Sequence, residues 1–297
     1  MLEEIREKFP EYGISELNKG WSKDRKFILE GADERFTLRC SQDKTLDHQR
    51  AEYEVIGSIP RKDCIIRPAG YGTLNGNWTY ILYTYVEGRD LKEVITALPA
   101  GVQYDLGIQA GCTLKRIHQV KGGRDEEFES YFLRKIQRKI KGYREAKMEV
   151  TGMEEHISFI EHNRHLLKGR PTVLQHGDYH LGNMVLQDQK VQIIDFNRYD
   201  FGDPYEEFNR MTMNSRYSKE FARGMLHGYF QGTPPMEFFS LLKLYVLTNA
   251  VGSISWAIHH SPESMEFVLE MIHETLKDYE DPSSPIPGWY KELLDYA

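Results

Sequence analysis

The sequence has little of several features that would assign it to a specialised class of protein. Its three cysteines, Cys40, Cys64 and Cys112, are widely spaced and form no C-x-x-C pair, so they indicate neither a disulfide framework nor a zinc site. The first residues, MLEEIREKFPEYG, contain acidic side chains and no apolar segment, unlike a signal peptide. We find no run of about 18 apolar residues that predicts a membrane span. We therefore expect a cytoplasmic protein that binds no membrane.

Positive charge is scarce relative to negative charge. With 38 Lys and Arg against 45 Asp and Glu, the formal net charge is −7. A nucleic-acid surface needs concentrated positive charge, so this balance argues against a nucleic-acid partner. It favours a cationic substrate, although many enzymes with neutral substrates are equally acidic. The chain of 297 residues is long enough for one large domain or two lobes.

The stretch from 175 to 210 contains the residues with the clearest chemistry. Asp178 and Asn183 lie in a polar loop that is rich in glycine, and Asp195 ends the second of two short apolar strands. Two strands around a tight turn bring their outer ends together, so we expect Asp178, Asn183 and Asp195 to converge. Three oxygen-bearing side chains at one point suit a hard cation such as Mg²⁺.

The same residues allow other interpretations. His176, Asp178 and His180 form a His-x-Asp-x-His pattern that could ligate zinc or iron in a hydrolase. Such an enzyme would need neither Asn183 nor the strand that leads to Asp195. Alternatively, Asp178 and Asn183 could be turn formers that bond the local backbone. The phosphotransfer arrangement of kinases, an Asp, four residues, an Asn and a strand ending on a second Asp, accounts for all three residues together.

These motifs resemble the catalytic core of the aminoglycoside phosphotransferase and choline kinase group, a branch of the kinase-like superfamily. That group has H-G-D-x-x-x-x-N, then I-D-F or I-D-W, and usually G-D-P, which here are residues 176–183, 194–196 and 202–204. The resemblance implies an α+β fold of the protein-kinase-like, two-lobed type. Residues 1–86 would form a mainly β, nucleotide-binding lobe, and residues 87–297 a helical lobe with the catalytic loop and the acceptor site.

The resemblance also implies a reaction, the transfer of the γ-phosphate of ATP or GTP to a hydroxyl group of a small molecule. Asp178 would orient that hydroxyl and accept its proton, while Asn183 and Asp195 hold Mg²⁺ against the triphosphate. The family offers aminoglycosides first as acceptors, then macrolides and other antibiotics, choline, sugars and other hydroxylated metabolites. Antibiotic resistance is one role that follows from this. The protein would be a monomer or a homodimer. The alternative to an active kinase is a nucleotide-binding pseudokinase.

Two strands near the N-terminus would contact the nucleotide phosphates in such an enzyme. The hairpin over 14–29 would cover them, with Ser22 as the candidate contact; its one glycine, Gly20, does not make a Gly-rich loop. On the next strand Arg39 stands where protein kinases have a Lys. Arginine keeps the positive charge and can hold phosphate or carboxylate through two parallel hydrogen bonds.

A helix is predicted over 45–58, with Leu46 and Ala51 among its inner residues. Glu52 in this helix matches the ion-pairing Glu of the family, and Glu54 is the alternative. A solvated helix carboxylate is the usual fate of either residue.

The strand over 77–86 ends at turn residues that resemble the hinge between kinase lobes. By that resemblance, the main-chain groups of Thr84 and Val86 would hydrogen bond the adenine ring.

Three charged segments lie in the C-terminal part. The helix over 131–147 has seven basic residues, and the helix over 262–279 has five carboxylates on one face. A solvated face explains the charges of both helices. In the family, the region of the helix over 131–147 helps form the acceptor pocket. The carboxylates of the helix over 262–279 could alternatively form an acidic wall for a polycationic sugar. Asp203, Glu206 and Glu207 follow Asp195 and could lie near the pocket, or Asp203 could cap a helix or support the loop.

Overall fold

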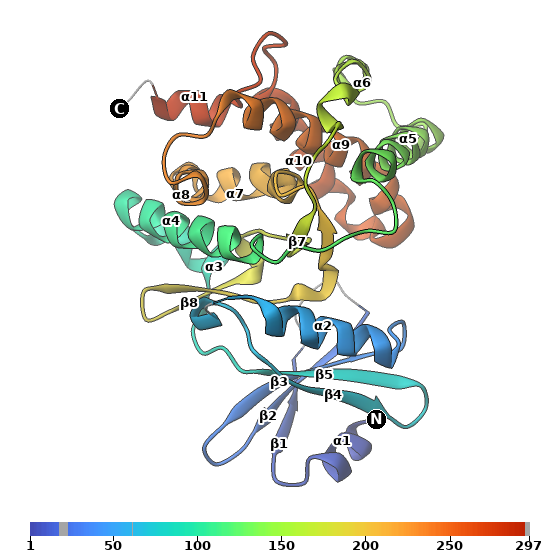
Figure 1. The fold of residues 1–297 in the computed structure, drawn as a ribbon, viewed down its shortest axis with the longest axis vertical. Helices are drawn as coiled ribbons and strands as arrows, with labels where there is room; N and C mark the ends of the chain where they lie inside the picture. The colour runs from blue at the N-terminus through green and yellow to red at the C-terminus, as the bar shows by residue number, and fades with distance from the viewer. Residues whose placement is uncertain (18–22, 61, 295–297) are drawn as a thin grey trace. The chain divides into compact units, whose positions relative to one another are not determined.

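The computed structural model describes residues 1–17, 23–60 and 62–294. By their contacts, the described residues form two compact units, Met1–Asp90 with Met184–Asn197, and Leu91–Asn183 with Arg198–Ala297. The predicted lobes, 1–86 and 87–297, placed the segment 184–197 with the C-terminal lobe, whereas its contacts lie in the first unit. The predicted α+β class is confirmed, with an antiparallel sheet in the N-terminal part and helices in the C-terminal part (Figure 1).

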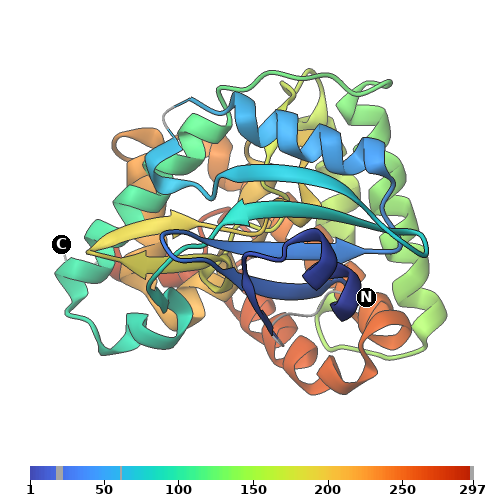
Figure 2. The same cartoon turned by 90° about the horizontal axis from the view of Figure 1, so that it is seen from below.

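The first unit is built on an antiparallel sheet in the order β1-β2-β3-β5-β4. Its strands are β1 (Gly13–Glu16), β2 (Arg25–Glu30), β3 (Arg35–Ser41), β4 (Pro68–Leu74) and β5 (Trp78–Thr84). Its helical segments are α1 (Leu2–Lys8), α2 (Leu46–Ser58) and the 3₁₀ helix η1 (Lys62–Cys64). Helix α2 runs along one face of the sheet beside β4 and β5 (Figure 2).

The period-two alternation of β3 gives the sheet two different faces. Leu38 and Cys40 are buried in an apolar cluster together with Ile5 of α1. Arg39 lies between them in the sequence and therefore faces the opposite side, where α2 packs.

Helix α2 buries only part of the face that its sequence predicted, which was Leu46, Ala51, Val55 and Ile56: Ile56 is buried and Val55 is partly buried. Leu46 and Ala51 are exposed, and the buried residues are Gln49, Glu52 and Ile56. The reason is that this helix packs against the polar face of the sheet, so its inward positions are carboxylate and amide side chains that bond to the strands.

A second sheet in the first unit consists of β6 (Arg89–Asp90), β8 (Met184–Gln187) and β9 (Lys190–Ile193), in the order β6-β8-β9. The hairpin β8–β9 turns at Asp188 and Gln189, both with positive φ, which is the geometry of tight hairpin turns. The Ile66 N–H donates to the Ile193 carbonyl at 2.9 Å. Pairing with β6 and this bond tie the hairpin to the first unit.

The second unit is mainly helical. Its segments before the β8–β9 hairpin are α3 (Leu91–Val94), η2 (Ile95–Ala97), α4 (Ala100–Ile117), α5 (Phe128–Ala146), α6 (Met153–His162), η3 (Arg164–Leu167), β7 (Val173–Gln175) and η4 (Leu181–Asn183). The segments after the hairpin are η5 (Phe196–Arg198), β10 (Asp200–Gly202), η6 (Glu206–Arg210), α7 (Met211–Tyr217), α8 (Lys219–Phe230), α9 (Met236–His260), η7 (Pro262–Ser264), α10 (Met265–Asp278) and α11 (Gly288–Leu294). β7 and β10 pair antiparallel.

Helix α9 forms the core of the second unit. Helices α5, α6 and α10 pack against it. By length and composition α9 could also cross a membrane, but 67% of its most apolar window is buried inside the structure. Burial in the core accounts for its apolar composition.

Helices α4 and α8 pack backbone to backbone through glycines. A Cβ atom added at Gly111 would lie 2.1 Å from the Met225 carbonyl oxygen, and one added at Gly224 would lie 2.2 Å from the Tyr104 carbonyl oxygen. Any side chain at these positions would push the helices apart.

Candidate active site

The loop that contains Asp178 begins where β7 ends. Gly177 has φ +82°, and a Cβ atom there would lie 1.9 Å from the Arg198 carbonyl oxygen. Both the left-handed backbone and the lack of space require glycine. This explains why the loop has His-Gly-Asp at this point.

Hydrogen bonds from two later segments fix the backbone of this loop. The N–H groups of His176 and Gly177 donate to the Glu207 carboxylate at 2.5 and 3.0 Å, and the Leu181 N–H donates to Asn214 Oδ1 at 3.0 Å. Because the acceptor at Glu207 is charged, these bonds are stronger than bonds between neutral groups.

Asp178 and Asn183 are brought together within the second unit. The Asn183 Nδ2 donates to the Asp178 carbonyl at 2.9 Å. Since this bond uses the amide nitrogen, the Asn183 amide oxygen is the atom that could bind a cation.

The Asp178 carboxylate lies among positive side chains. Arg210 Nε donates to Oδ1 at 3.1 Å, His180 Nε2 lies 3.5 Å from the same oxygen, and Arg198 Nη1 lies 3.8 Å from Oδ2. Burial alone would raise the pKa of Asp178, but the hydrogen bond from His180 and the charges of Arg210 and Arg198 outweigh it and hold the pKa well below its usual range. Asp178 is therefore an ionised acceptor at neutral pH.

The contacts of the two histidines are structural. The Nδ1 of His180 accepts the Gly182 N–H at 3.0 Å, so its Nε2 carries the proton that faces Asp178. His176 is fully buried, its Nδ1 accepts the Asp178 N–H at 3.3 Å, and its ring packs edge-on against Tyr179. Both rings thus shape the loop. Within the described part of the chain, no group of three or more His, Cys, Asp and Glu side chains is arranged to hold a metal ion.

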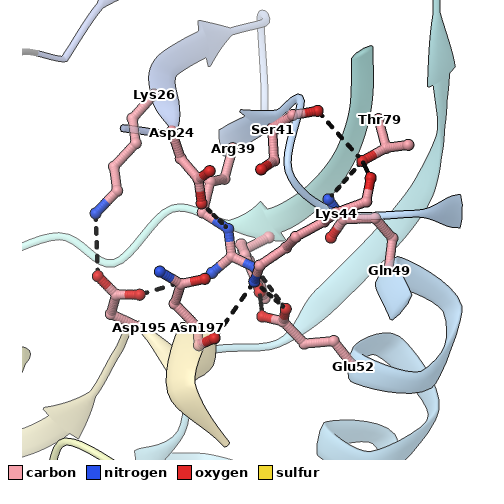
Figure 3. A network of polar contacts seen from close by, with 11 residues as sticks. Asp24, Lys26, Arg39, Ser41, Lys44, Gln49, Glu52, Thr79, Asp195 and Asn197 are labelled. Atoms are coloured by element: carbon pink, nitrogen blue, oxygen red, sulfur yellow. Dashed lines mark hydrogen bonds and ion pairs between the residues drawn. The ribbon is translucent and has the colours of Figure 1, made fainter. Parts of the chain in front are cut away.

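In the first unit, Arg39 is the centre of a buried network (Figure 3). Its side chain is 2% exposed, and its Nη2 lies 2.5 Å from the Glu52 carboxylate. Its Nε lies 3.5 Å from Asp24 and its Nη1 3.6 Å from Asp195. One guanidinium group therefore holds three carboxylates from three different segments.

Lys26 is the second cation at Asp195. Lys26 and Arg39 are directly opposite in the β2–β3 register, so their side chains share one face of the sheet. The Lys26 ammonium lies 3.0 Å from Asp195 Oδ2. Asp195 itself has φ +65°, a left-handed conformation that Asp adopts more readily than most residues.

Glu52 has further partners besides Arg39. Lys44 Nζ lies 3.3 Å from its carboxylate, and the Tyr83 hydroxyl donates to it. Burial and the neighbouring Arg39 charge lower the pKa of the Lys44 ammonium, against the opposing effect of Glu52. Glu54, the alternative considered from the sequence, is exposed.

Ser22, Thr84 and Val86 were predicted to contact the nucleotide, and the structure describes two of them. Ser22 lies outside the described residues. The Thr84 N–H already donates to the Arg67 carbonyl at 2.9 Å, so a ligand could use only the Thr84 carbonyl. Val86 is partly buried.

The acidic residues that follow Asp195 are bound to structural partners. Asp203 is fully buried and accepts from Arg170 at 2.5 and 3.1 Å and from the Tyr245 hydroxyl at 2.6 Å. Glu206 pairs with Lys135 of α5, and Glu207 holds the catalytic loop. The Asp203 carboxylate also accepts the Tyr205 N–H at 2.9 Å, just before η6, so these contacts hold its own turn, Arg170 and Tyr245, and none of them is made to residues 176–183.

Sequence reasoning missed several residues of these networks. The position of Lys26 depends on the strand register, Asp24 lies just before β2, and Arg210 acts on Asp178 from η6. His180, which the sequence offered as a metal ligand, instead contacts Asp178.

Comparison with known proteins gives one family and a fold. The model of the phosphotransferase enzyme family matches residues 13–239. No curated protein matches the chain. Solved structures with a similar fold include a mutant of aminoglycoside 2'-phosphotransferase IIIa with GDP, with a TM-score of 0.72 and 13% identity over 95% of this chain and 98% of that one.

Two further solved structures are similar. A thermostable mutant of aminoglycoside phosphotransferase APH(4)-Ia, without ligand, has a TM-score of 0.70 and 14% identity over 95% of this chain and all of that chain. Aminoglycoside phosphotransferase APH(2'')-Ib with ADP has a TM-score of 0.61 and 18% identity over 93% and 96%. At these identities the likeness establishes the fold.

Proposed function

Because the chain belongs to the phosphotransferase enzyme family, we propose that it is a small-molecule kinase that transfers the γ-phosphate of ATP or GTP to a hydroxyl group. The observation that carries this proposal is the fixed loop in which Asn183 bonds to the Asp178 backbone and Glu207 holds the preceding amides. Similar structures bind the expected ligand types. APH(2'')-IIa was solved with streptomycin and ATP, and an APH(4)-Ia mutant with ADP and hygromycin B.

Asp178 is proposed to orient the acceptor hydroxyl and to take its proton. The low pKa of Asp178 makes it a weak base. A weak base suffices, because phosphoryl transfer passes through a loose transition state in which positioning and charge stabilisation matter more than early proton removal.

Asn183 and Asp195 are the residues that would hold Mg²⁺. An amide oxygen and a carboxylate are ligands that this cation prefers. The two residues flank one hairpin, because Asn183 directly precedes β8 and Asp195 follows β9. Met184 and Ile193 are register partners in that hairpin, so the connectivity of the chain supports the proposal that Asn183 and Asp195 bind the same cation. The bound cation would neutralise charge on the triphosphate.

Positive charge for the phosphates is proposed to come from Arg39 and Lys26. Arg39 is held by three carboxylates and serves mainly to position Asp195 and Glu52, whereas Lys26 is the more exposed of the two. The Thr84 carbonyl and the Val86 amide remain the proposed adenine contacts, and Ser22 a proposed phosphate contact. A cytoplasmic setting, where nucleoside triphosphates are plentiful, fits this chemistry.

The test combines nucleotide binding with transfer. Thermal shift with MgATP and MgGTP should show a magnesium-dependent stabilisation. Asp195→Ala should remove its magnesium dependence. Asp178→Asn should keep nucleotide binding and slow transfer by roughly 10²-fold or more.

Asp105→Ala is the matched control, because Asp105 is an exposed carboxylate on α4. It should behave like the wild type in both assays. Absence of any nucleotide-dependent shift would refute the proposal. Nucleotide binding without transfer to a broad acceptor panel would favour a pseudokinase instead.

A further inference from the structure

Positive side chains gather near Asp178 in the second unit. We call Lys135, Arg138, Lys139, Arg198 and Arg210 the basic cluster. Arg210 and Arg198 contact the Asp178 carboxylate at 3.1 and 3.8 Å. Lys135, Arg138 and Lys139 lie on α5, and the charges of Lys135, Arg210 and Arg138 all act on Lys139. The cluster thus extends from α5 to the carboxylate that would orient the acceptor.

Lys139 is the unusual member of the basic cluster. Its stem packs over Gly252 of α9, where an added Cβ atom would lie 2.7 Å from Lys139 Cγ and Cδ. Its ammonium contacts Asn249 Oδ1 at 3.4 Å, and among the described residues no carboxylate lies within ion-pair distance of it. Burial, together with the charges of Lys135 and Arg210, lowers the pKa of Lys139 well below its usual value.

The nearby acidic groups are already bound to other partners. Glu206 pairs with Lys135, Glu207 accepts from the loop amides, and Asp203 is bound by Arg170 and Tyr245. Arg138, which is exposed, and Lys139 therefore add positive charge without an ion pair of their own among the described residues; the charge of Glu206 acts favourably on Lys139, but Glu206 is paired with Lys135.

A solvated basic surface does not explain this arrangement. Lys141, two residues further along α5, is 75% exposed and pairs with Glu145, as an ordinary surface lysine does. Lys139 instead points inward over a glycine and next to other cations. Holding a cation there is unfavourable unless an anion binds.

We propose that the basic cluster binds an oxyanionic group, a carboxylate or a phosphate, on the acceptor whose hydroxyl Asp178 orients. This inference rests on the proposed function and names its substrate class, a hydroxylated anion such as a sugar acid or a sugar phosphate. It differs from the expectation of a cationic acceptor, which rested on the net charge of −7, because the field that a ligand meets is set by local charges. A polycationic aminoglycoside would be repelled at this point.

The experiment uses the full-length protein and an acceptor panel with four arms: sugar acids, sugar phosphates, neutral sugars, and cations (aminoglycosides and choline). Transfer is followed as MgATP- or MgGTP-dependent phosphorylation, and binding of each compound is measured separately by calorimetry without nucleotide. We expect transfer and binding in one of the two anionic arms. The arm that responds shows whether the oxyanion is a carboxylate or a phosphate.

Lys139→Met and Lys141→Met form the matched pair of variants. Lys139→Met should raise KM and Kd for the anionic acceptor by roughly tenfold or more, as expected for loss of one charge-assisted contact. It should leave nucleotide binding and kcat nearly unchanged, and Lys139→Arg should restore part of the affinity. Lys141→Met should match the wild type. Thermal unfolding of Lys139→Met should show no loss of stability, because the substitution removes a buried charge.

Each outcome decides a different question. Phosphorylation of aminoglycosides, choline or neutral sugars, without binding or phosphorylation of any anionic compound, overturns this inference and leaves the kinase proposal standing. Anion binding that Lys139→Met does not weaken also overturns it. Anion binding without any nucleotide-dependent shift supports the basic cluster and refutes the kinase proposal.

Discussion

Replacing Arg39 and Glu52 singly and together measures how strongly the buried network holds the first unit. Arg39→Met removes the guanidinium from three carboxylates, of which Glu52 is 0% exposed. Glu52 would keep only Lys44 and the Tyr83 hydroxyl. Breaking a buried ion pair from one side costs about 3–5 kcal/mol of unfolding free energy, because it leaves a buried charge without its partner.

The reverse substitution is milder. Glu52→Gln keeps the shape of the side chain, and Arg39 retains Asp24 and Asp195 at 3.5 and 3.6 Å. We expect about 1.5–3 kcal/mol, the loss of one hydrogen bond to a charged group. The double variant removes both charges, so neither Arg39 nor Glu52 is left buried without the other. The double variant should therefore lose less unfolding free energy than the two single variants added together. The difference is the coupling energy, which we expect toward the upper end of about 0.5–3 kcal/mol.

Equilibrium unfolding in urea, followed by far-UV circular dichroism and by fluorescence, gives the three free energies if the two probes coincide. The control cycle uses Arg25→Met and Glu16→Gln, an ion pair at 2.7 Å in the same sheet whose side chains are 41% and 39% exposed. Its coupling should stay below about 1 kcal/mol. A coupling at Arg39 and Glu52 no larger than that of the exposed pair would refute the reasoning.

Three further predictions follow from the second unit. Glu207→Gln should lower kcat about 100-fold with unchanged nucleotide Kd, because the loop that positions Asp178 loses its charged acceptor; steady-state kinetics with an unchanged kcat would contradict this. Gly111→Ala should lower the unfolding free energy by about 1–3 kcal/mol through the α4–α8 contact, whereas Gly123→Ala, with open space around it, should not, as urea unfolding of both would show. Since the pKa of Asp178 is depressed in the folded protein, its ionised form persists until the pH falls below the usual carboxyl range of about 4, and stability is lost as the pH falls through the lower folded value. Arg210→Gln removes one cause of that depression, so it should move any acid limb of kcat/KM to higher pH, and an unmoved pH–rate profile would rule out this role of Arg210.

The family and the fold were predictable because their signals are local. The segment 176–204 contains His-Gly-Asp, Asn183 and Asp195 at fixed spacing, and Gly177 is required by a single backbone conformation. The kinase-like resemblance and the α+β class that this segment predicted are confirmed.

The polar networks were less predictable because they depend on register and on distant partners. Alternation places Lys26 on a strand, but only the β2–β3 register puts it opposite Arg39 and next to Asp195. A shift by one residue would turn it to the apolar face. Helix α2 shows the same limit, since its hydrophobic pattern found the buried Ile56 but also pointed to the exposed Leu46 and Ala51 and missed the buried Gln49 and Glu52. A pattern of apolar residues cannot find a helix that packs on a polar face.

The short helix η6 shows why the catalytic loop and the basic cluster depend on each other. In a 3₁₀ helix, residues three apart lie on the same side. Glu207 and Arg210 are three apart, and both face the catalytic loop, one through the amides of His176 and Gly177 and one through the Asp178 carboxylate. Glu206 points elsewhere and pairs with Lys135 on α5. One turn therefore positions both the carboxylate that is proposed to orient the hydroxyl and part of the charge that would bind the acceptor. Substitutions within η6 should change kcat and acceptor KM together, whereas Lys139→Met should change KM alone.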